Sequence, residues 1–153
     1  MEPLHFLLMR AHTTLNRRIL SGAAGLGLSP GQPKILEYLL SRGESNQKAI
    51  AAGCEIEPAT VGSILLRMER DGLVCRTQRQ GNRRSLWVSL TPRGHQLALE
   101  MEEIFCQADR QAEAPLTEGQ RRQLRQLLQA LCDGLAPEPN CRERESCDGC
   151  DEG

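Results

Sequence analysis

The order of predicted elements between residues 46 and 90 constrains the fold of this 153-residue chain more than any other feature. A short helix is predicted over about residues 46–53, with Ile50 and Ala51 on its buried side. Pro58 suits the first position of a second helix, because its ring fixes φ and its missing N–H is not needed there. Gly72 ends that helix, since glycine readily adopts the left-handed conformation found after helix C-termini. Two helices joined by so tight a break are typical of a helix-turn-helix.

A strongly basic hairpin is predicted directly after the second helix. Its strands are the runs LVCRT at 73–77 and LWVSL at 86–90, and a polar, glycine-containing loop joins them. No acidic residue occurs between residues 72 and 99, and the hairpin carries four arginines: Arg76, Arg79, Arg83 and Arg84. Solvated charge runs usually mix signs, but charge of one sign is what a phosphate backbone or a narrow minor groove attracts. The predicted fold is therefore mainly α with a small β-hairpin, a winged helix-turn-helix that contacts double-stranded DNA.

The N-terminal part of the second helix offers only small or polar side chains, as a helix lying in the major groove must. These residues are Ala59, Thr60, Gly62 and Ser63. Gly62 weakens a helix by about 1 kcal/mol relative to alanine, which a close approach to the sugar-phosphate backbone would offset. An ordinary amphipathic core helix explains the same residues, and the adjoining basic hairpin favours the DNA-binding interpretation.

Amphipathic helices are predicted on both sides of this segment. The first covers about residues 3–24, and two more fill residues 92–135 with a break at Pro115. The last has the most regular apolar stripe of the chain: Leu124, Leu127, Leu128, Leu131 and Leu135. A chain of this length has little need for such helices unless they pack on a second copy, so a homodimer is expected. Packing within one chain is the alternative.

Capping motifs place two of the helix starts. Ser29 and Gln32 form a capping box with Pro30 at the first helical position. Pro33 is unusual in that setting, because it removes an early backbone donor. The sequence TEGQ at 117–120 forms a second capping box ahead of the leucine stripe.

Composition and charge restrict the class of protein. The net charge is −1 and 39% of the residues are hydrophobic, which suffices for one modest core. Residues 137–153 contain six acids and two arginines, a net charge of −4, which leaves about +3 on residues 1–136. The N-terminal run FLLM is much shorter than a signal-peptide core, and no stretch is long enough to cross a membrane. A cytoplasmic protein without a membrane partner is expected.

The seven cysteines form an odd number, which argues against a secreted disulfide framework. Cys54 and Cys75 are expected to be buried as small apolar residues, and Cys106 and Cys132 to pack in the flanking helices. No arrangement typical of an enzyme is recognisable: no serine, histidine and carboxylate set, no phosphate-binding loop and no supported pair of carboxylates. No enzyme is expected, and no cofactor is required.

The acidic tail at 137–153 carries the three remaining cysteines: Cys141, Cys147 and Cys150. Because it lacks apolar residues, the tail is expected to be disordered. Its CxxC spacing also suits zinc or a reversible disulfide. Disorder without a site, a redox switch and a metal site all stay open, and so does a competing interpretation in which the tail is the main functional site of a redox- or metal-sensing module.

Four blocks of the sequence resemble the multiple-antibiotic-resistance regulator (MarR) family. They are FLLMRAHTTLNRRI, LGLSPGQPKILEYL, NQKAIAAGCEIEPATVGSILLRMERDGLV and NRRSLWVSLTPRG. The resemblance implies one domain at 1–136, with a DNA-binding lobe at about 29–92 and dimerisation helices at 3–24 and 92–135. It also implies a homodimeric transcriptional regulator, usually a repressor, on a pseudo-palindromic operator. A small molecule, oxidant or metal would act as effector between the lobe and the dimerisation helices.

The resemblance places groove contacts on Thr60, Gly62, Ser63 and Arg67 and the wing tip on Arg83. The full set of expected DNA-binding residues is Asn46, Gln47, Thr60, Gly62, Ser63, Arg67, Arg76, Arg79, Asn82, Arg83 and Arg84. His12 is a candidate residue of the effector pocket.

Two residues depart from the family pattern. Asn82 stands where an aspartate commonly holds the following arginine, here Arg84, so the charge assistance of that hydrogen bond is lost. Glu55 stands in the turn where glycine is usual, and a slightly different turn geometry is expected there.

Overall fold

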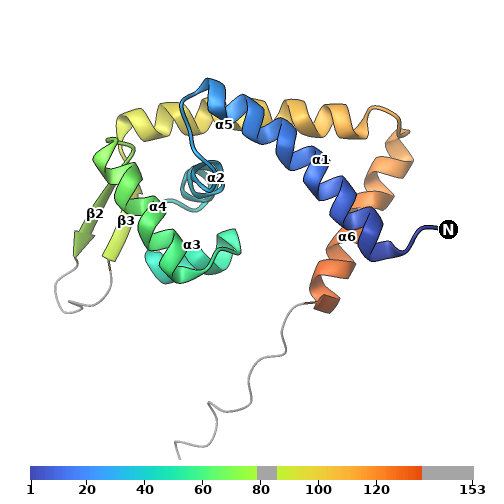
Figure 1. Ribbon diagram of the computed structural model, residues 1–153, viewed down its shortest axis with the longest axis horizontal. Helices are drawn as coiled ribbons and strands as arrows, with labels where there is room; N and C mark the ends of the chain where they lie inside the picture. Colours follow the sequence, from blue (N-terminus) through green and yellow to red (C-terminus); the bar gives the residue numbers. More distant parts are fainter. Residues whose placement is uncertain (79–85, 136–153) are drawn as a thin grey trace, which may run out of the picture. The chain divides into compact units, whose positions relative to one another are not determined.

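The computed structural model describes residues 1–78 and 86–135 (Figure 1). In chain order its elements are α1 (Leu4–Gly25), α2 (Gln32–Arg42), β1 (Ser45–Asn46), α3 (Gln47–Cys54), α4 (Pro58–Arg70), β2 (Val74–Gln78), β3 (Leu86–Leu90), α5 (Pro92–Glu113) and α6 (Glu118–Leu135). The chain divides into two compact units, residues 1–112 and 113–153. The first unit contains the expected winged helix-turn-helix, and the predicted fold class is confirmed.

The start of α2 differs from the predicted one. The side chain of Gln32 accepts a hydrogen bond from the Ser29 backbone N–H at 2.8 Å, as half of a capping box would. The helix nevertheless begins at Gln32, so Pro30 lies before it and Pro33 occupies its first turn. The expected position of Pro30 was wrong, and Pro33 is not anomalous, because a proline in the first turn has no intrahelical hydrogen bond to lose.

The turn between α3 and α4 keeps the backbone conformation that glycine would supply. Glu55 adopts the left-handed region with φ 52° and ψ 47°, and it is the one non-glycine residue with positive φ in the described part of the chain. The expected difference from the family's turn stays a prediction, while the left-handed conformation of this residue is the one that glycine adopts most readily. The substitution is accommodated at the cost of local strain, since a side chain in this region is disfavoured. Pro58 begins α4, as predicted.

A third strand completes the sheet that the sequence predicted as a two-stranded hairpin. The strand order is β1-β3-β2, and both pairings are antiparallel. Ser45 pairs with Val88, and Cys75 pairs with Ser89. The strand β1 has only two residues, too few for a period-2 pattern to be recognised. It connects the start of α3 to strand β3 of the wing.

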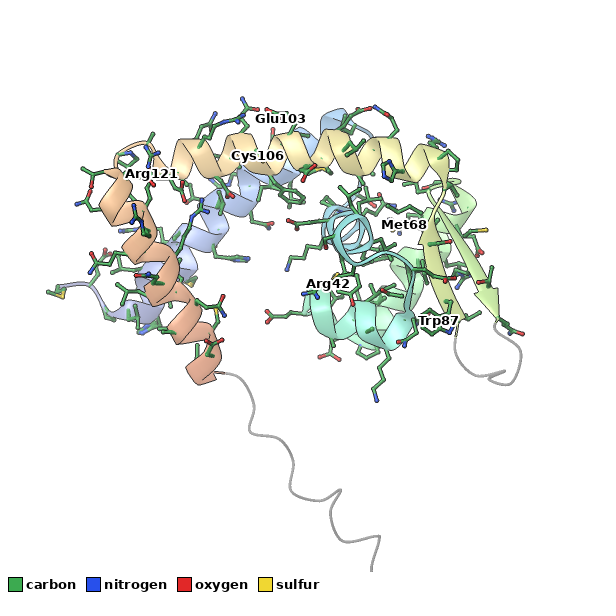
Figure 2. All side chains as sticks on the ribbon, turned by 180° about the vertical axis from the view of Figure 1, so that it is seen from behind. Arg42, Met68, Trp87, Glu103, Cys106 and Arg121 are labelled. Carbon is green, nitrogen blue, oxygen red and sulfur yellow. The ribbon has the colours of Figure 1, made fainter. Side chains whose placement is uncertain are left out.

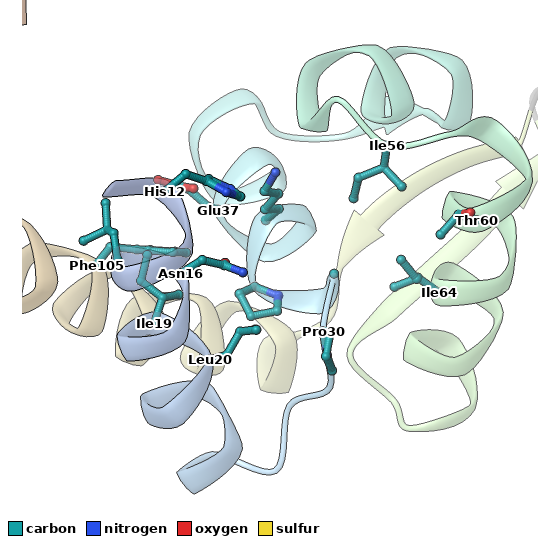
Figure 3. A pocket seen from close by; sticks show the side chains of 14 residues that line it. His12, Asn16, Ile19, Leu20, Pro30, Glu37, Ile56, Thr60, Ile64 and Phe105 are labelled. Atoms are coloured by element: carbon teal, nitrogen blue, oxygen red, sulfur yellow. The ribbon is translucent and has the colours of Figure 1, made fainter. Parts of the chain in front are cut away.

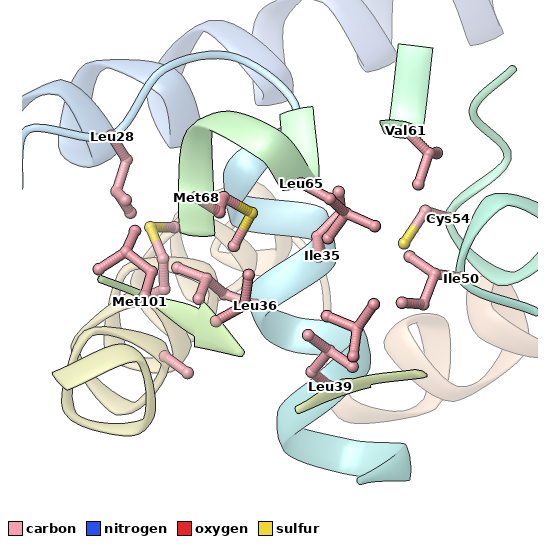
Figure 4. Packing of buried hydrophobic residues seen from close by; sticks show 14 of the residues in the cluster. Leu28, Ile35, Leu36, Leu39, Ile50, Cys54, Val61, Leu65, Met68 and Met101 are labelled. Carbon is pink, nitrogen blue, oxygen red and sulfur yellow. The ribbon is translucent and has the colours of Figure 1, made fainter. Parts of the chain in front are cut away.

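One apolar core joins the helices of the first unit to the sheet (Figure 4). Leu65 and Met68 from α4 meet Ile35 and Leu36 from α2, and all four side chains are fully buried. Met101 brings α5 into the same cluster. Because α4 is anchored by its buried side, the opposite side is held in a fixed orientation toward solvent.

The junction of sheet and α5 is tightly packed. Thr91 caps α5, because its hydroxyl accepts a hydrogen bond from the Gly94 N–H at 3.0 Å and donates one to the Gly72 carbonyl at 2.6 Å. Gly94 is buried, and a Cβ atom there would overlap the carbonyl oxygen of Leu73. The close approach explains why glycine is required at this position.

The second unit contains α6, whose predicted capping box is confirmed. The Thr117 backbone N–H donates to the Gln120 side chain at 2.9 Å, and the Gln120 N–H reaches back to the Thr117 hydroxyl at 3.4 Å. Glu113 and Arg125 form an ion pair at 2.6 Å beside it. No residue of α6 is buried, and its leucine stripe is exposed except for the half-buried Leu131; the exposed fraction of Leu127 is 61%.

Among the described residues, no single helix combines the length and apolar character needed to cross a membrane. Only α3 and α4 taken together, bent by 111°, pass by length and composition.

Candidate nucleic-acid interface

The helix α4 has three distinct sides. One side packs into the core through Val61, Leu65 and Met68 (Figure 4). A second faces a cavity through Thr60 and Ile64 (Figure 3). The remaining side is open to solvent, which is what a helix that enters a DNA groove requires.

Two of the predicted contacts on α4 engage neighbouring groups of the protein. Arg67 is exposed, and its guanidinium donates to the Ser29 hydroxyl at 3.3 Å, which links α4 to the segment before α2. The Ser63 hydroxyl donates back to the Ala59 carbonyl at 3.2 Å. Both hydrogen bonds are at the protein surface, so DNA phosphates can replace them at little cost.

The start of α3 lies against the middle of α4. Asn46 caps α3, because its side-chain oxygen accepts a hydrogen bond from the Ala49 N–H at 2.8 Å. Gln47 lies close to Gly62, where an added Cβ would be 3.1 Å from the Gln47 amide nitrogen. Gly62 therefore makes room for a side chain of the neighbouring helix. Its proposed close approach to DNA is a separate expectation.

The first strand of the wing is fixed to α4 by an ion pair. The guanidinium of Arg76 donates to one carboxylate oxygen of Glu69 from Nε at 2.8 Å and from a terminal nitrogen at 2.5 Å. The hydrogen bond from Arg76 holds the pKa of the Glu69 carboxyl below its usual range. Only 17% of the Arg76 side chain is exposed. In the structure Arg76 is paired with an acid seven residues upstream in the same chain, and DNA binding by Arg76 stays a prediction.

The other wing residues of the prediction lie outside the described residues: Arg79, Asn82, Arg83 and Arg84. The signal for the Glu69–Arg76 pair was present in the sequence, because a helix end followed by a turn and a strand brings residues seven apart together. The prediction for Arg76 considered acidic residues only between residues 72 and 99, and Glu69 lies before that range.

A cavity of about 580 Å³ opens beside α4, lined by residues of α1, α2 and α5 as well (Figure 3). Its walls are mostly apolar, and the residues that line it are His12, Leu15, Asn16, Ile19, Leu20, Pro30, Gly31, Pro33, Lys34, Glu37, Ile56, Thr60, Ile64 and Phe105. The structure thus places His12, the candidate pocket residue, in a cavity wall. The volume matches that of sites for small organic molecules.

Three ionisable side chains line this cavity: His12, Lys34 and Glu37. Glu37 is exposed as a whole residue, but its carboxyl group is partly buried. This burial raises the pKa of Glu37, and the acids Asp109 and Glu102 raise it further, while Lys34 opposes them. An anion in the cavity would gain from the two basic side chains and lose from Glu37. Sequence reasoning missed Lys34 and Glu37, because a residue pair at i and i+3 on a helix carries no sign of a cavity.

The described cysteines are unpaired: Cys54, Cys75, Cys106 and Cys132. Cys54 is buried as expected, its thiol donates to the Lys34 carbonyl at 3.5 Å, and burial raises its pKa. Cys75 is exposed, so its predicted burial was wrong: its side chain lies on the solvent side of an edge strand. Cys141, Cys147 and Cys150 lie outside the described residues, and the described residues contain no group of three metal-binding side chains.

Comparisons with known proteins agree with this architecture. A model of the MarR family matches residues 28–86. The HTH-type transcriptional repressor Rv2887 of Mycobacterium tuberculosis is 29% identical over 129 residues, which cover 84% of this chain and 93% of that protein. The homoprotocatechuate degradative operon repressor of Escherichia coli is 41% identical over 76 residues, which cover 50% of this chain and 51% of that protein.

Solved structures extend the similarity to nearly the whole described chain. A probable transcriptional regulator from Pseudomonas aeruginosa is 30% identical with a TM-score of 0.75, and the match covers 85% of this chain and 97% of that one. Rv2887 in complex with salicylic acid is 28% identical with a TM-score of 0.68, over 86% of this chain and 97% of that one. The helix-turn-helix, the wing and the flanking helices therefore occur together in related regulators, and this chain belongs to the MarR family of transcriptional regulators.

Proposed function

We propose that this protein is a homodimeric, sequence-specific repressor that leaves its operator when a small aromatic acid occupies the cavity beside α4. The observation that carries the proposal is the position of α4. It presents one side to solvent and a second side to a cavity, so one helix can contact DNA and sense a ligand.

DNA binding is supported by the surface around α4. Arg67 and Arg70 are exposed on the helix, and Lys48 is exposed on α3. The arginines that the sequence places at the tip of the wing add further positive charge. Basic groups arranged about a solvent-facing helix match the phosphates that border a major groove.

Dimerisation is supported by apolar side chains that the single chain leaves exposed. On α1 they are Leu4, Phe6, Leu7 and Met9, and on α6 they are Leu124, Leu127, Leu128 and Leu135. Several exposed apolar side chains on long helices are typical of interfaces between copies. A two-fold dimer would present two copies of α4 to successive turns of a pseudo-palindromic operator.

An aromatic acid is the effector that best fits the cavity lining. Phe105 and several aliphatic side chains offer contacts to a ring, Lys34 offers positive charge to a carboxylate, and His12 offers a ring nitrogen for a hydrogen bond. The related repressor Rv2887 has been crystallised with salicylic acid. The ligand would act on α4 directly, because Thr60 and Ile64 belong both to the cavity and to that helix.

The DNA-binding part is tested by gel shifts with the promoter region next to the gene. A discrete complex that survives excess non-specific DNA is expected. The variant Arg67→Ala should weaken that complex by about 1 to 3 kcal/mol if the side chain reaches a base, and by less if it only contacts phosphate. Retention that non-specific DNA abolishes would refute sequence-specific binding.

The effector part is tested by titrating salicylate into the protein–operator complex. Lys34→Gln should weaken salicylate binding, and Glu37→Gln should strengthen it, because the two variants remove opposite charges from one cavity. Arg122→Gln is the matched control, since Arg122 is an exposed cation on α6 that lines neither the cavity nor the surface around α4. Equal salicylate affinity in all three variants would show that the acid binds elsewhere.

A further inference from the structure

The solvent side of α4 carries an exposed leucine, Leu66. At 100° per residue, Ala59, Ser63, Leu66 and Arg70 share the helix side opposite the buried Val61, Leu65 and Met68, and all four are exposed. The exposed fraction of Leu66 is 60%, a large apolar exposure for the middle of a helix otherwise packed on a core. Leu66 belongs neither to the buried apolar cluster nor to the lining of the cavity beside α4.

The residues on the N-terminal side of Leu66 have small side chains. Ala59 and Gly62 have no polar side chain, and the Ser63 hydroxyl donates to the Ala59 carbonyl. Long side chains on a helix lean toward its N-terminus. Leu66 therefore covers the surface above Gly62 and Ser63, where small side chains leave space for it.

In the major groove of B-DNA, only one base edge is apolar, the 5-methyl group of thymine. We propose that Leu66 is a specificity-determining residue of α4, which contacts thymine methyl groups of the operator. The inference rests on the proposed DNA-binding function and specifies which base edges this helix selects. Thymines are the favoured bases opposite Leu66 in each half-site.

The charge around Leu66 identifies DNA as its occupant. Arg67 and Arg70 flank it on the helix surface, and Arg70 is only loosely paired with Asp71, at 3.3 Å between exposed groups. Glu69, the other acid near Leu66, is paired with Arg76. An apolar side chain set between exposed cationic groups suits a groove bordered by phosphates. It is poorly suited to an apolar face of a second copy, where those charges would be desolvated.

The experiment first selects an operator from random duplexes with the full-length protein. Each thymine of that operator is then replaced singly by deoxyuridine, which keeps base pairing and removes only the 5-methyl group. Affinities are measured for the wild type, for Leu66→Ala and for Leu99→Ala. Leu99 is a matched control, because it is 43% exposed but lies on α5.

The wild type and Leu99→Ala should lose about fourfold in affinity for each contacted methyl group, the value expected for one buried methyl. Leu66→Ala should bind thymine and deoxyuridine operators almost equally. The inference is overturned if no deoxyuridine substitution weakens the wild-type complex, or if Leu66→Ala keeps the full discrimination. It is also overturned if Leu66→Ala changes the oligomeric state in sedimentation, because Leu66 would then be a protein contact. Failure to select any operator would instead refute the proposed function.

Discussion

The helices α4 and α6 both carry a regular apolar stripe, yet the described chain covers only one of them. The stripe of α4 is fully buried, with Val61, Leu65 and Met68 in the core. The stripe of α6 is exposed, with 61% of Leu127 and 75% of Leu135 accessible. Periodicity in a sequence therefore predicts that a helix has an apolar side, but it does not predict which chain supplies the atoms that cover it. On our proposal, the core of one copy covers α4 and a second copy covers α6.

The difference between α4 and α6 is tested most directly by placing charged residues in the apolar stripe of α6. The double variant Leu124→Asp, Leu127→Asp should separate the copies, because two carboxylates would have to be buried at the interface. Operator affinity should fall by about 100- to 10,000-fold, the usual advantage of two linked binding sites over one. Sedimentation and gel shifts measure the two effects.

The control for that variant is Gln123→Asp, Gln126→Asp, which adds the same charge at polar, exposed positions of α6. It should remain dimeric. A dimer that survives the leucine substitutions would mean that the stripe packs within its own chain or stays in solvent.

The second variant tests the packing of the buried region at Gly94, where the structure leaves no room for a side chain. Gly94→Ala places a Cβ against the backbone of Leu73, where no side-chain movement can relieve the overlap. The free energy of unfolding should decrease by about 3 kcal/mol, near the upper end for overpacked sites. Urea unfolding measures it. Gly25→Ala, with nothing within 4 Å of the new atom, should leave the free energy unchanged or raise it, and equal effects of the two variants would contradict the packing argument.

The third variant separates stability from DNA binding within α4. Gly62→Ala should raise the free energy of unfolding by about 0.5 to 1 kcal/mol, because alanine restricts the unfolded chain and Gln47 can move aside. Operator affinity should nevertheless fall if the backbone of α4 approaches the DNA closely at this residue. Thermal unfolding and gel shifts on one preparation measure both. A stabilised variant with unchanged affinity would show that Gly62 serves only the packing of Gln47.

The smallest effect is expected at the ion pair between α4 and the wing. The pKa of Glu69 is lowered in the folded protein, so the pair stabilises the fold at pH values above the ordinary range of a glutamate. That contribution is lost as the pH falls through the lowered pKa. Because Glu69 is 38% exposed, the effect should stay below about 1 kcal/mol. Urea titrations at several pH values should show a shallower acid dependence for Glu69→Gln than for the wild type, and parallel curves would contradict the assignment.

The sequence predicted most helix positions well because helical periodicity, proline and capping residues are local signals. It placed Pro58 and the capping box at 117–120 correctly. It misplaced the start of α2, because Pro30 and Pro33 both satisfy the local rule and only the tertiary course of the loop decides between them. It missed β1, since two residues form a strand only through their partners on β3.

Less of the candidate interface could be predicted than of the fold. Residue type identified Arg67 and Arg76 as cations, but not that Arg76 is held by Glu69. The exposure of Cys75 depends on which face of β2 meets the core, which a five-residue strand with mixed polarity does not specify. Lys34 and Glu37 line a cavity only because α1, α4 and α5 enclose the space next to their side chains.

The shared wall formed by Thr60 and Ile64 has a thermodynamic consequence. If a ligand in the cavity lowers the affinity for DNA by some factor, bound DNA must lower the affinity for the ligand by the same factor. A tightly held operator would then raise the ligand concentration needed for release, and a weak operator would lower it. One protein could thus set different response thresholds at different promoters, graded by operator strength alone.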